Sequence, residues 1–292
     1  ASATAHLQKP RAGPPPLCPR PGLHQTVFPW FAQRAALKRP AFTLLELLLA
    51  LTIIALLMAL LLPAVAAVRD HAADAQCKHH LKVLGQGVLT YAAQHRGLFP
   101  PVADWRNEPV RYWWGVNAAK PDFKQGLIYR HLGYLAGTER SLFECPAQPW
   151  GSYQPQGAAG EPTTTYGYNG YYLCPAGTPG WAQSIGHRPW RSIYTVQNPD
   201  QVFMLADTLM NWGNGYVTNN CLLDPPWTWQ RRRWRLNPFT TLCFRHCGRA
   251  NVCFANGAVD SVEPTTIIDP DHMIGYVGDS NAPHYVPDWK DW

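Results

Sequence analysis

A single carboxylate, Glu46, stands near the start of a long uncharged segment of this chain. From residue 47 to residue 62 every side chain is apolar except that of Thr52, and two cations, Lys38 and Arg39, precede the segment. A charge buried in hydrocarbon costs several kcal/mol or is neutralised. Because apolar packing alone would not keep such a carboxylate, we expect Glu46 to have a partner.

The residues around Glu46 resemble the N-terminal segment of type IV prepilins and type II secretion pseudopilins. The resemblance is carried by the string Pro40-Ala41-Phe42-Thr43-Leu44-Leu45-Glu46 and the apolar run after it. It implies that prepilin peptidase cleaves the bond between Ala41 and Phe42 and methylates the new amine of Phe42. The family usually carries glycine at the position of Ala41, and alanine keeps that position small. The resemblance also implies that Glu46 meets the amine of a neighbouring subunit, which neutralises both charges.

An ordinary signal anchor is the alternative interpretation of this segment. Residues 44–62 are long enough to span about 30 Å of hydrocarbon as a helix, and Lys38 and Arg39 would hold the N-terminal side in the cytoplasm. A cleaved secretory signal fits less well, because its apolar core is shorter, about 7 to 15 residues. A plain anchor does not explain Glu46, so we favour the prepilin-like interpretation.

The net charge of +6 comes from the first 41 residues, which carry six basic residues and no acid. Of the 25 basic residues, the 19 that remain equal the 19 acidic ones. A nucleic-acid partner is therefore not expected, because the remaining chain has no electrostatic support for one. The basic segment is also rich in proline, which predicts a disordered leader.

Cysteine, histidine and aspartate side chains invite a metal interpretation. After removal of the leader the chain keeps seven cysteines, an odd number that leaves at least one thiol free or paired between chains; they are Cys77, Cys145, Cys174, Cys221, Cys243, Cys247 and Cys253. Cys243 and Cys247 lack zinc-ribbon spacing, and on a strand they would share one face while His246 points to the other. We therefore expect His246 to be a hydrogen-bonded structural residue near a turn, and we assign no metal.

Catalytic motifs such as Gly-x-Ser-x-Gly, a P-loop or His-Glu-x-x-His do not occur in the sequence. We therefore predict a protein that is not an enzyme and has no organic cofactor. Calcium is the one ion that the resemblance raises, because the major pseudopilin commonly binds it in a loop. The oxygen ligands on offer here are Asp269, Asp271, Asp279 and Asn281. Solvated turn residues are the simpler interpretation.

A basic and aromatic patch near the C-terminal third supports the alternative function. It consists of Trp227, Trp229, Arg231, Arg232, Arg233, Trp234 and Arg235. Such a patch could bind a glycan or another ligand, which would make the chain a membrane-anchored surface or periplasmic binding protein. An exposed loop or edge strand explains the same residues without a ligand.

One long helix must position the N-terminal residues. Apolar side chains recur at three- and four-residue spacing beyond the apolar segment, which predicts an amphipathic continuation to about His95; they are Val65, Val68, Ala72, Ala75, Leu81, Leu84, Val88 and Tyr91. Pro63, which the resemblance places in the assembly helix, should kink it. Gly85 and Gly87 should let another element pack closely.

A hairpin is predicted near the C-terminal end of the domain. Residues 251–255 alternate as a strand, Asn256 and Gly257 form a type I′ turn signal, and residues 258–262 return as the partner strand. This segment resembles the His-x9-Asp-Gly motif of a bacterial subgroup of pseudopilin-like proteins, with His246 in place and Asn256 at the aspartate position. Four other segments of that subgroup resemble residues 77–101, 142–146, 166–169 and 202–208, in the same order.

Together these features predict an α+β, pilin-like fold in which a long N-terminal helix, half membrane-spanning and half amphipathic, packs on an antiparallel β-sheet. Residues 1–41 would be a removed leader, 42–68 the transmembrane and assembly helix, and 69–292 a periplasmic domain. The resemblance implies a structural subunit of a type II secretion pseudopilus or type IV pilus-like fibre. Its partners would be prepilin peptidase and other pilin or pseudopilin subunits, in the bacterial inner membrane and then in a periplasmic or surface fibre.

Overall fold

The computed structural model describes residues 43–106, 108–116, 122–133, 142–148, 164–213 and 215–292. The expected leader and the bond between Ala41 and Phe42 lie outside the described residues. Contacts divide the chain into two units, Ala1–Ile54 and Ala55–Trp292.

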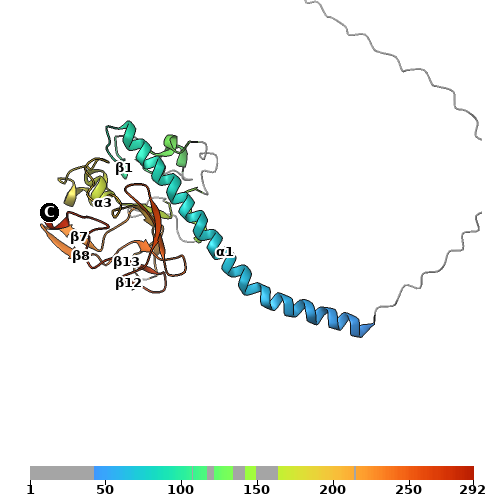
Figure 1. Cartoon of the computed structure of the whole chain (residues 1–292). Coiled ribbons are helices and arrows are strands. Elements are labelled where there is room, and N and C mark those ends of the chain that lie inside the picture. The colour runs from blue at the N-terminus through green and yellow to red at the C-terminus, as the bar shows by residue number, and fades with distance from the viewer. Residues whose placement is uncertain (1–42, 107, 117–121, 134–141, 149–163, 214) are drawn as a thin grey trace, which may run out of the picture. The chain divides into compact units, whose positions relative to one another are not determined.

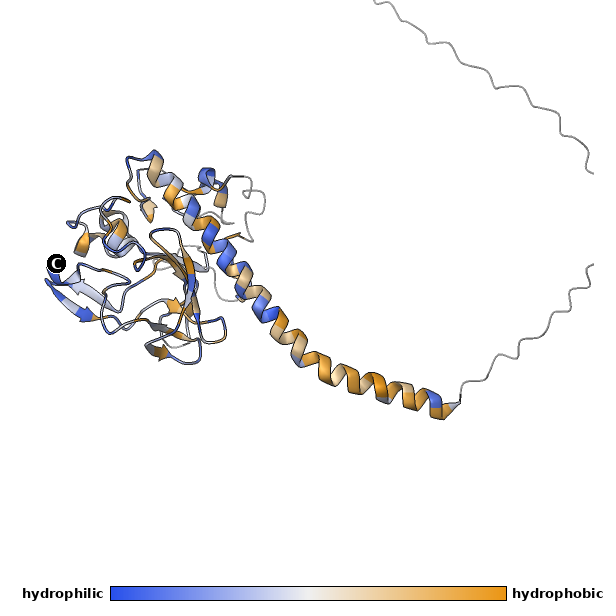
Figure 2. Ribbon diagram, viewed as in Figure 1, coloured by the Kyte–Doolittle hydropathy of each residue, from blue (hydrophilic) through white to orange (hydrophobic). Residues whose placement is uncertain are grey.

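Helix α1 extends from Leu44 to Gln94 (Figure 1), so it ends one residue before the expected His95. Pro63 lies inside it. A Schellman motif ends the helix, because Arg96 is left-handed with φ of 58° and the Gly97 amide donates to the Ala92 carbonyl at 2.8 Å. The N-terminal part of α1 is apolar on all sides, as the orange ribbon in Figure 2 shows.

The buried face of α1 begins at Cys77 and not at the start of the predicted stripe. Leu81, Leu84 and Val88 are buried as expected. The predicted apolar stripe does not pack on the domain at its first four members, which are exposed; they are Val65, Val68, Ala72 and Ala75. In the described part of the chain, the core side chains that α1 contributes all lie from Cys77 onward, so spacing alone did not show where the contact with the sheet begins.

The main sheet has the strand order β11-β10-β4-β3, and all its pairings are antiparallel. Its strands are β3 (Tyr166–Tyr168), β4 (Phe203–Asp207), β10 (Ala250–Phe254) and β11 (Val259–Val262). Every residue of β4 is buried, as expected of a central strand covered on both faces. Helix α1 approaches β10 at Gly85, where an added Cβ would lie 2.4 Å from the Cys253 sulfur.

Shorter elements complete the domain. A three-stranded sheet has the order β12-β13-β9, formed by Thr266–Asp269, Ile274–Tyr276 and Leu242–Cys243. Three two-stranded pairs are also described. In the first, β1 (Ala103–Asp104) pairs with β2 (Arg111–Tyr112), and in the second, β5 (Met210–Asn211) pairs with β6 (Val217–Thr218). In the third, β7 (Trp227–Gln230) pairs with β8 (Arg233–Leu236). The short α-helices are α3 (Gly170–Leu173) and α4 (Ala182–Ile185). The 3-10 turns are Phe123–Gln125, Tyr129–His131, Pro175–Gly177 and Trp289–Asp291.

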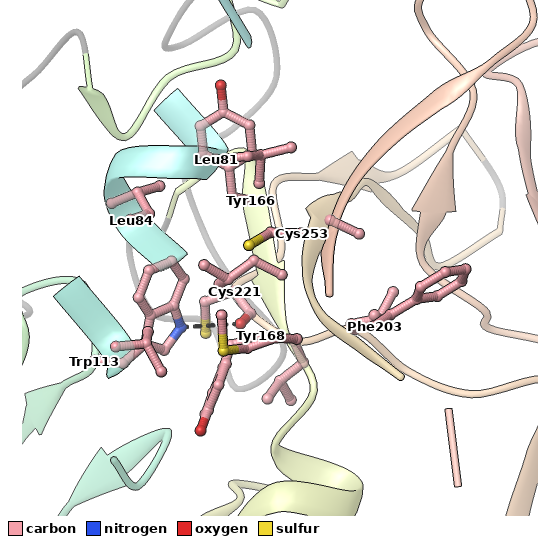
Figure 3. Close-up of a cluster of buried hydrophobic side chains, with 14 of the residues drawn as sticks. Leu81, Leu84, Trp113, Tyr166, Tyr168, Phe203, Cys221 and Cys253 are labelled. Atoms are coloured by element: carbon pink, nitrogen blue, oxygen red, sulfur yellow. Dashed lines mark hydrogen bonds between the residues drawn. The ribbon is translucent and has the colours of Figure 1, made fainter. Parts of the chain in front are cut away.

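The core lies between α1 and the main sheet and is rich in aromatic rings. Figure 3 shows Leu81 and Leu84 of α1 beside Trp113 and the two tyrosines of β3. The polar atoms of these rings are satisfied, since the Trp113 indole donates to the Cys221 carbonyl at 3.1 Å and the Tyr168 hydroxyl to the Pro100 carbonyl at 3.1 Å. The fold is thus α+β, with a long helix and antiparallel sheets, as predicted.

The β10–β11 hairpin forms as expected, but its predicted type I′ turn is wrong. Gly257 has φ of 82°, whereas Asn256 is not among the residues with positive φ. The Gly257 amide donates to the Phe254 carbonyl, and the Phe254 amide donates to the Ala258 carbonyl, both at 2.8 Å. The loop therefore has three residues, a type I turn followed by a left-handed glycine. Asn256 favours it because its Oδ1 accepts the Ala258 amide at 2.8 Å.

Candidate functional site

The first candidate region is the start of α1, where Thr43 and Glu46 form reciprocal hydrogen bonds. The Glu46 amide donates to Thr43 Oγ1 at 3.2 Å, and Glu46 Oε2 accepts the Thr43 amide and hydroxyl, each at 2.9 Å. This is a capping box, which satisfies free backbone donors of the first helical turn. The signal Thr-x-x-Glu before an apolar run was present in the sequence, so Glu46 has a local partner that sequence analysis missed.

The apolar part of α1 has no cover within the described chain. Every leucine, isoleucine and methionine side chain from residue 44 to residue 62 is at least 50% exposed. By length and composition α1 is able to cross a membrane, and among the described residues it is the one helix that meets this test. An apolar surface of this kind requires lipid or protein around it.

The basic and aromatic patch forms the hairpin β7–β8. Its two-residue turn has the type I′ pattern, with φ of 51° at Arg231 and 61° at Arg232. The tryptophans pack inward, since the rings of Trp229 and Trp234 lie 5.3 Å apart and the Trp234 indole donates to the Trp289 carbonyl at 2.8 Å. Within the patch Arg231, Arg232 and Arg233 are exposed, whereas the three tryptophans are half-buried, so the patch presents mainly positive charge and little aromatic surface.

The expected calcium ligands include two residues that are already hydrogen-bonded. The Asp269 carboxylate accepts Asn211 Nδ2 at 2.6 Å and faces His272 Nδ1 at 2.8 Å. The Asn281 amide binds the Trp227 backbone through both of its ends, at 3.0 and 2.8 Å. These side chains fix local backbone, and calcium binding remains a prediction from the sequence.

His246 lies in a buried cluster with Cys77, Cys145 and Asp207. The ligand atoms of the four residues all lie within 4.8 Å of one another. His246 Nε2 is 3.3 Å from both Cys145 Sγ and Asp207 Oδ2, and Cys77 Sγ donates to Asp207 Oδ1 at 3.5 Å. His246 is 6% exposed and the other three residues are 0% exposed. Sequence analysis named Cys77, Cys145 and His246 but did not place them together, and Asp207 lay within one of the resembling segments, 202–208.

A tight turn positions His246. Its amide and carbonyl pair with those of Arg249 at 3.0 Å each, across Cys247 and Gly248, whose φ values are 51° and 82°. His246 therefore does lie beside a turn. The expectation that Cys243 and Cys247 share the face of one strand is wrong, because Cys247 occupies this turn and is exposed while Cys243 is buried in β9.

The cluster is strongly polarised. Burial alone would raise the pKa of the Cys145 thiol, but hydrogen bonds with Cys77 and His246 lower it to about 6. Burial would lower the pKa of His246, but hydrogen bonds to Asp207 and Cys145 and their charges raise it to about 10. Burial raises the pKa of Cys77 well above its usual value. A deprotonated sulfur beside an imidazole and a carboxylate is able to act as a nucleophile or to bind a metal ion.

Comparison with known families identifies the prokaryotic N-terminal methylation motif at residues 38–62. The matched segment contains Ala41, Phe42 and Glu46. No curated protein and no solved structure matches the chain. The protein is thus prepilin-like in its N-terminal segment, while the likeness of its C-terminal segment to the His-x9-Asp-Gly motif rests on the sequence strings alone.

Proposed function

We propose that this prepilin-like protein is a structural subunit of a type II secretion pseudopilus or a type IV pilus-like fibre. The observation that carries the proposal is the methylation motif at residues 38–62. In this function prepilin peptidase cleaves between Ala41 and Phe42 and methylates the amine of Phe42. The role of the chain is then assembly and not catalysis.

The exposed apolar surface of α1 supports this role. Residues 44–62 present apolar side chains on every side of the helix. Within a single subunit this surface is exposed, so lipid or another subunit must cover it. In the bacterial inner membrane lipid covers it, with Lys38 and Arg39 on the cytoplasmic side. In a fibre the helices of neighbouring subunits replace the lipid. The domain from residue 69 onward is then periplasmic, or lies on the surface of the fibre.

Glu46 has two partners in this function. Within one chain it caps the helix through Thr43. Cleavage before Phe42 leaves Thr43 as the second residue, so the capping box survives in the mature chain. The carboxylate stays exposed, and in the fibre it neutralises the methylated amine of a neighbouring subunit.

Mass spectrometry of the protein isolated from membranes tests the proposal. We expect a mature chain that begins at N-methylated Phe42. Ala41→Glu should block processing, because a charged side chain replaces a small one, whereas the matched control Ala41→Gly should be processed normally. An intact leader in the unsubstituted chain, or a cut at another bond, would contradict the proposal.

The alternative function is an anchored binding protein, and the exposed arginines at the β7–β8 turn favour it. A hollow lined by Gln183, Ser184, His187, Trp229, Arg231 and Arg232 adjoins that turn. A glycan or another ligand would bind there, and the anchor would need neither cleavage nor Glu46. The same mass spectrometry therefore separates the two functions.

A further inference from the structure

We propose that Cys77, Cys145, Asp207 and His246 bind a structural zinc ion that fastens helix α1 to the main sheet. The four residues come from four separate parts of the domain. Cys77 belongs to α1, Cys145 lies in the segment 142–148, Asp207 ends β4, and His246 precedes β10. The zinc site does not depend on the fibre role of the chain.

Backbone contacts hold the ligands in place. The Cys145 amide donates to Thr165 Oγ1 at 2.6 Å, next to strand β3. Asp207 is fixed by strand pairing with Tyr166 and accepts the Asn251 amide at 3.0 Å. Cys77 lies on a regular helix, and His246 is set by the turn at Cys247 and Gly248. The cluster is thus organised without an ion, as a tight metal site requires.

The spacing of the ligand atoms fits tetrahedral zinc. Zinc bonds of about 2.3 Å to sulfur and about 2.0 to 2.2 Å to nitrogen or oxygen place neighbouring ligand atoms about 3.3 to 3.8 Å apart. The distances here are 3.3 Å from His246 Nε2 to Cys145 Sγ, 3.3 Å from Nε2 to Asp207 Oδ2, and 3.6 Å from Cys77 Sγ to the same oxygen.

The direction of the imidazole separates a metal site from a catalytic triad. In a cysteine–histidine–aspartate triad the nucleophile and the carboxylate contact opposite ring nitrogens. Here Cys145 and Asp207 both contact Nε2 of His246. The groups therefore converge on one point instead of forming a relay through the ring, and such convergence is what a metal ion requires.

The other ring nitrogen has the outer partner typical of zinc-binding histidines. His246 Nδ1 lies 3.8 Å from the Asp74 carboxylate. Asp74 is itself held by Lys78 Nζ and by Asn251 Nδ2, each at 2.8 Å. At 3.8 Å this contact is an ion-pair distance and not a hydrogen bond. A carboxylate on this side of the ring favours a proton on Nδ1, which leaves Nε2 as the metal ligand.

The donor set and its charge select zinc. Thiolates and imidazole favour zinc over calcium or magnesium, and with the protein filling four buried positions the site resembles structural zinc centres. Two thiolates and one carboxylate exceed the charge of the ion by one. The half-buried Arg245 guanidinium, which donates to the carbonyl of Thr208 at 2.6 Å directly after Asp207, offsets the excess. A surface pocket lined by Asp74, Lys78, Arg245 and His246 gives the ion an entry route.

Elemental analysis of the full chain, purified in detergent without chelator, tests the site. We expect one zinc ion per chain in the unsubstituted protein and almost none in Cys145→Ser or His246→Ala. Two matched controls should keep the full zinc content. They are Cys253→Ser, a buried cysteine that faces α1 outside the cluster, and Cys247→Ser, the exposed neighbour of His246.

A second measurement uses the unsubstituted chain, so that no variant needs to fold. Removal of metal by a chelator should lower the thermal unfolding temperature, and zinc alone should restore it. Replacement by cobalt should produce the absorption bands of a tetrahedral site with thiolate ligands. Asp74→Asn should weaken zinc binding about 10- to 100-fold without abolishing it, as expected for an outer-shell partner.

Three results would overturn the zinc site. One is zinc far below stoichiometric amounts in protein expressed with ample zinc. Another is equal zinc content in Cys145→Ser and Cys253→Ser, which would show adventitious binding only. The third is a disulfide between Cys77 and Cys145, found by peptide mapping under non-reducing conditions, since the same sulfurs cannot then hold the ion as thiolates.

Discussion

At the scale of single residues, the capping role of Glu46 and its proposed role in the fibre are separable by mutation. Glu46→Leu should leave the globular domain folded but reduce incorporation into the fibre, because the amine of the neighbouring subunit loses its counter-charge. Thr43→Val is the matched control, since it removes the hydroxyl of the capping box and leaves the carboxylate. Fibre yield, measured by shearing and immunoblotting, should stay near normal in Thr43→Val. A normal yield from Glu46→Leu would favour a plain membrane anchor.

Asp224 makes stability depend on pH. Burial raises its pKa to about 6, although Trp181 Nε1 and Asn220 Nδ2 donate to the carboxylate at 2.7 and 3.4 Å. The folded chain therefore holds a proton that the unfolded chain releases above about pH 4. The protonated carboxyl therefore contributes fully to the free energy of unfolding below about pH 4. This contribution is lost as the pH rises through about 6, and the free energy of unfolding falls by about 3 kcal/mol at most.

Asp224→Asn should remove this dependence, because an amide does not titrate. We expect a higher thermal unfolding temperature than that of the unsubstituted chain at pH 7, and a smaller difference at pH 4. Circular dichroism at several pH values measures both. An unchanged slope between pH 4 and pH 7 would show that the carboxylate of Asp224 does not set the pH dependence.

At the scale of elements, the β10–β11 hairpin depends on Gly257. Its φ of 82° is unfavourable for other residues, and an added Cβ would lie 2.9 Å from Leu89 Cδ1 on α1. Gly257→Val should destabilise the domain by about 1 to 3 kcal/mol. Asn256→Asp should be nearly neutral, because a carboxylate oxygen can accept the Ala258 amide as the amide oxygen does. Chemical denaturation of both variants checks the contrast, and similar losses would mean that the loop geometry is not the cause.

The contact between α1 and β10 predicts a rescue experiment. Gly85→Ala should destabilise the domain, because its Cβ would lie 2.4 Å from Cys253 Sγ, and overpacking of a core costs about 1 to 3 kcal/mol. Cys253→Ala removes that sulfur, so the double variant should be less destabilised than the sum of the two single changes. A double-mutant cycle measures this coupling, and simple additivity would contradict the close approach.

Much of this element structure follows from local patterns. Apolar spacing predicted the extent of α1 within about one turn, and alternation predicted the hairpin around Gly257. The types of the two hairpin turns were harder to predict, because a type I′ turn and a three-residue loop both contain residues with left-handed backbone conformation. The type I′ geometry occurs at Arg231 and Arg232, where no Asn-Gly signal exists, and the Asn-Gly pair forms the three-residue loop.

Local sequence patterns could not predict the cluster formed by Cys77, Cys145, Asp207 and His246. Each residue lies in a different string of the sequence that resembled the pseudopilin-like subgroup. Zinc was judged only on the spacing of Cys243 and Cys247, which are close in sequence. Ligands that meet through tertiary packing leave no spacing signal, so only the fold could bring them together.

At the scale of the whole molecule, we predict that residues 69–292 fold without the apolar segment. The buried face of α1 starts at Cys77, so this truncation keeps every residue of α1 that packs on the sheet. The fragment should be soluble, stay helical and unfold in one cooperative transition. Circular dichroism with urea measures this. Soluble protein that lacks a cooperative transition would count against the packing of α1 on the sheet.

The order in which the ligands occur along the chain also has a consequence for biogenesis. Cys77 leaves the ribosome first, and His246 is the last of the four to emerge, after most of the domain has been made. A chain that stops early lacks the histidine and cannot complete the proposed coordination sphere. Metal capture would then be a late event that marks a finished subunit, and quality control could distinguish complete from incomplete chains by whether zinc has locked the helix in place.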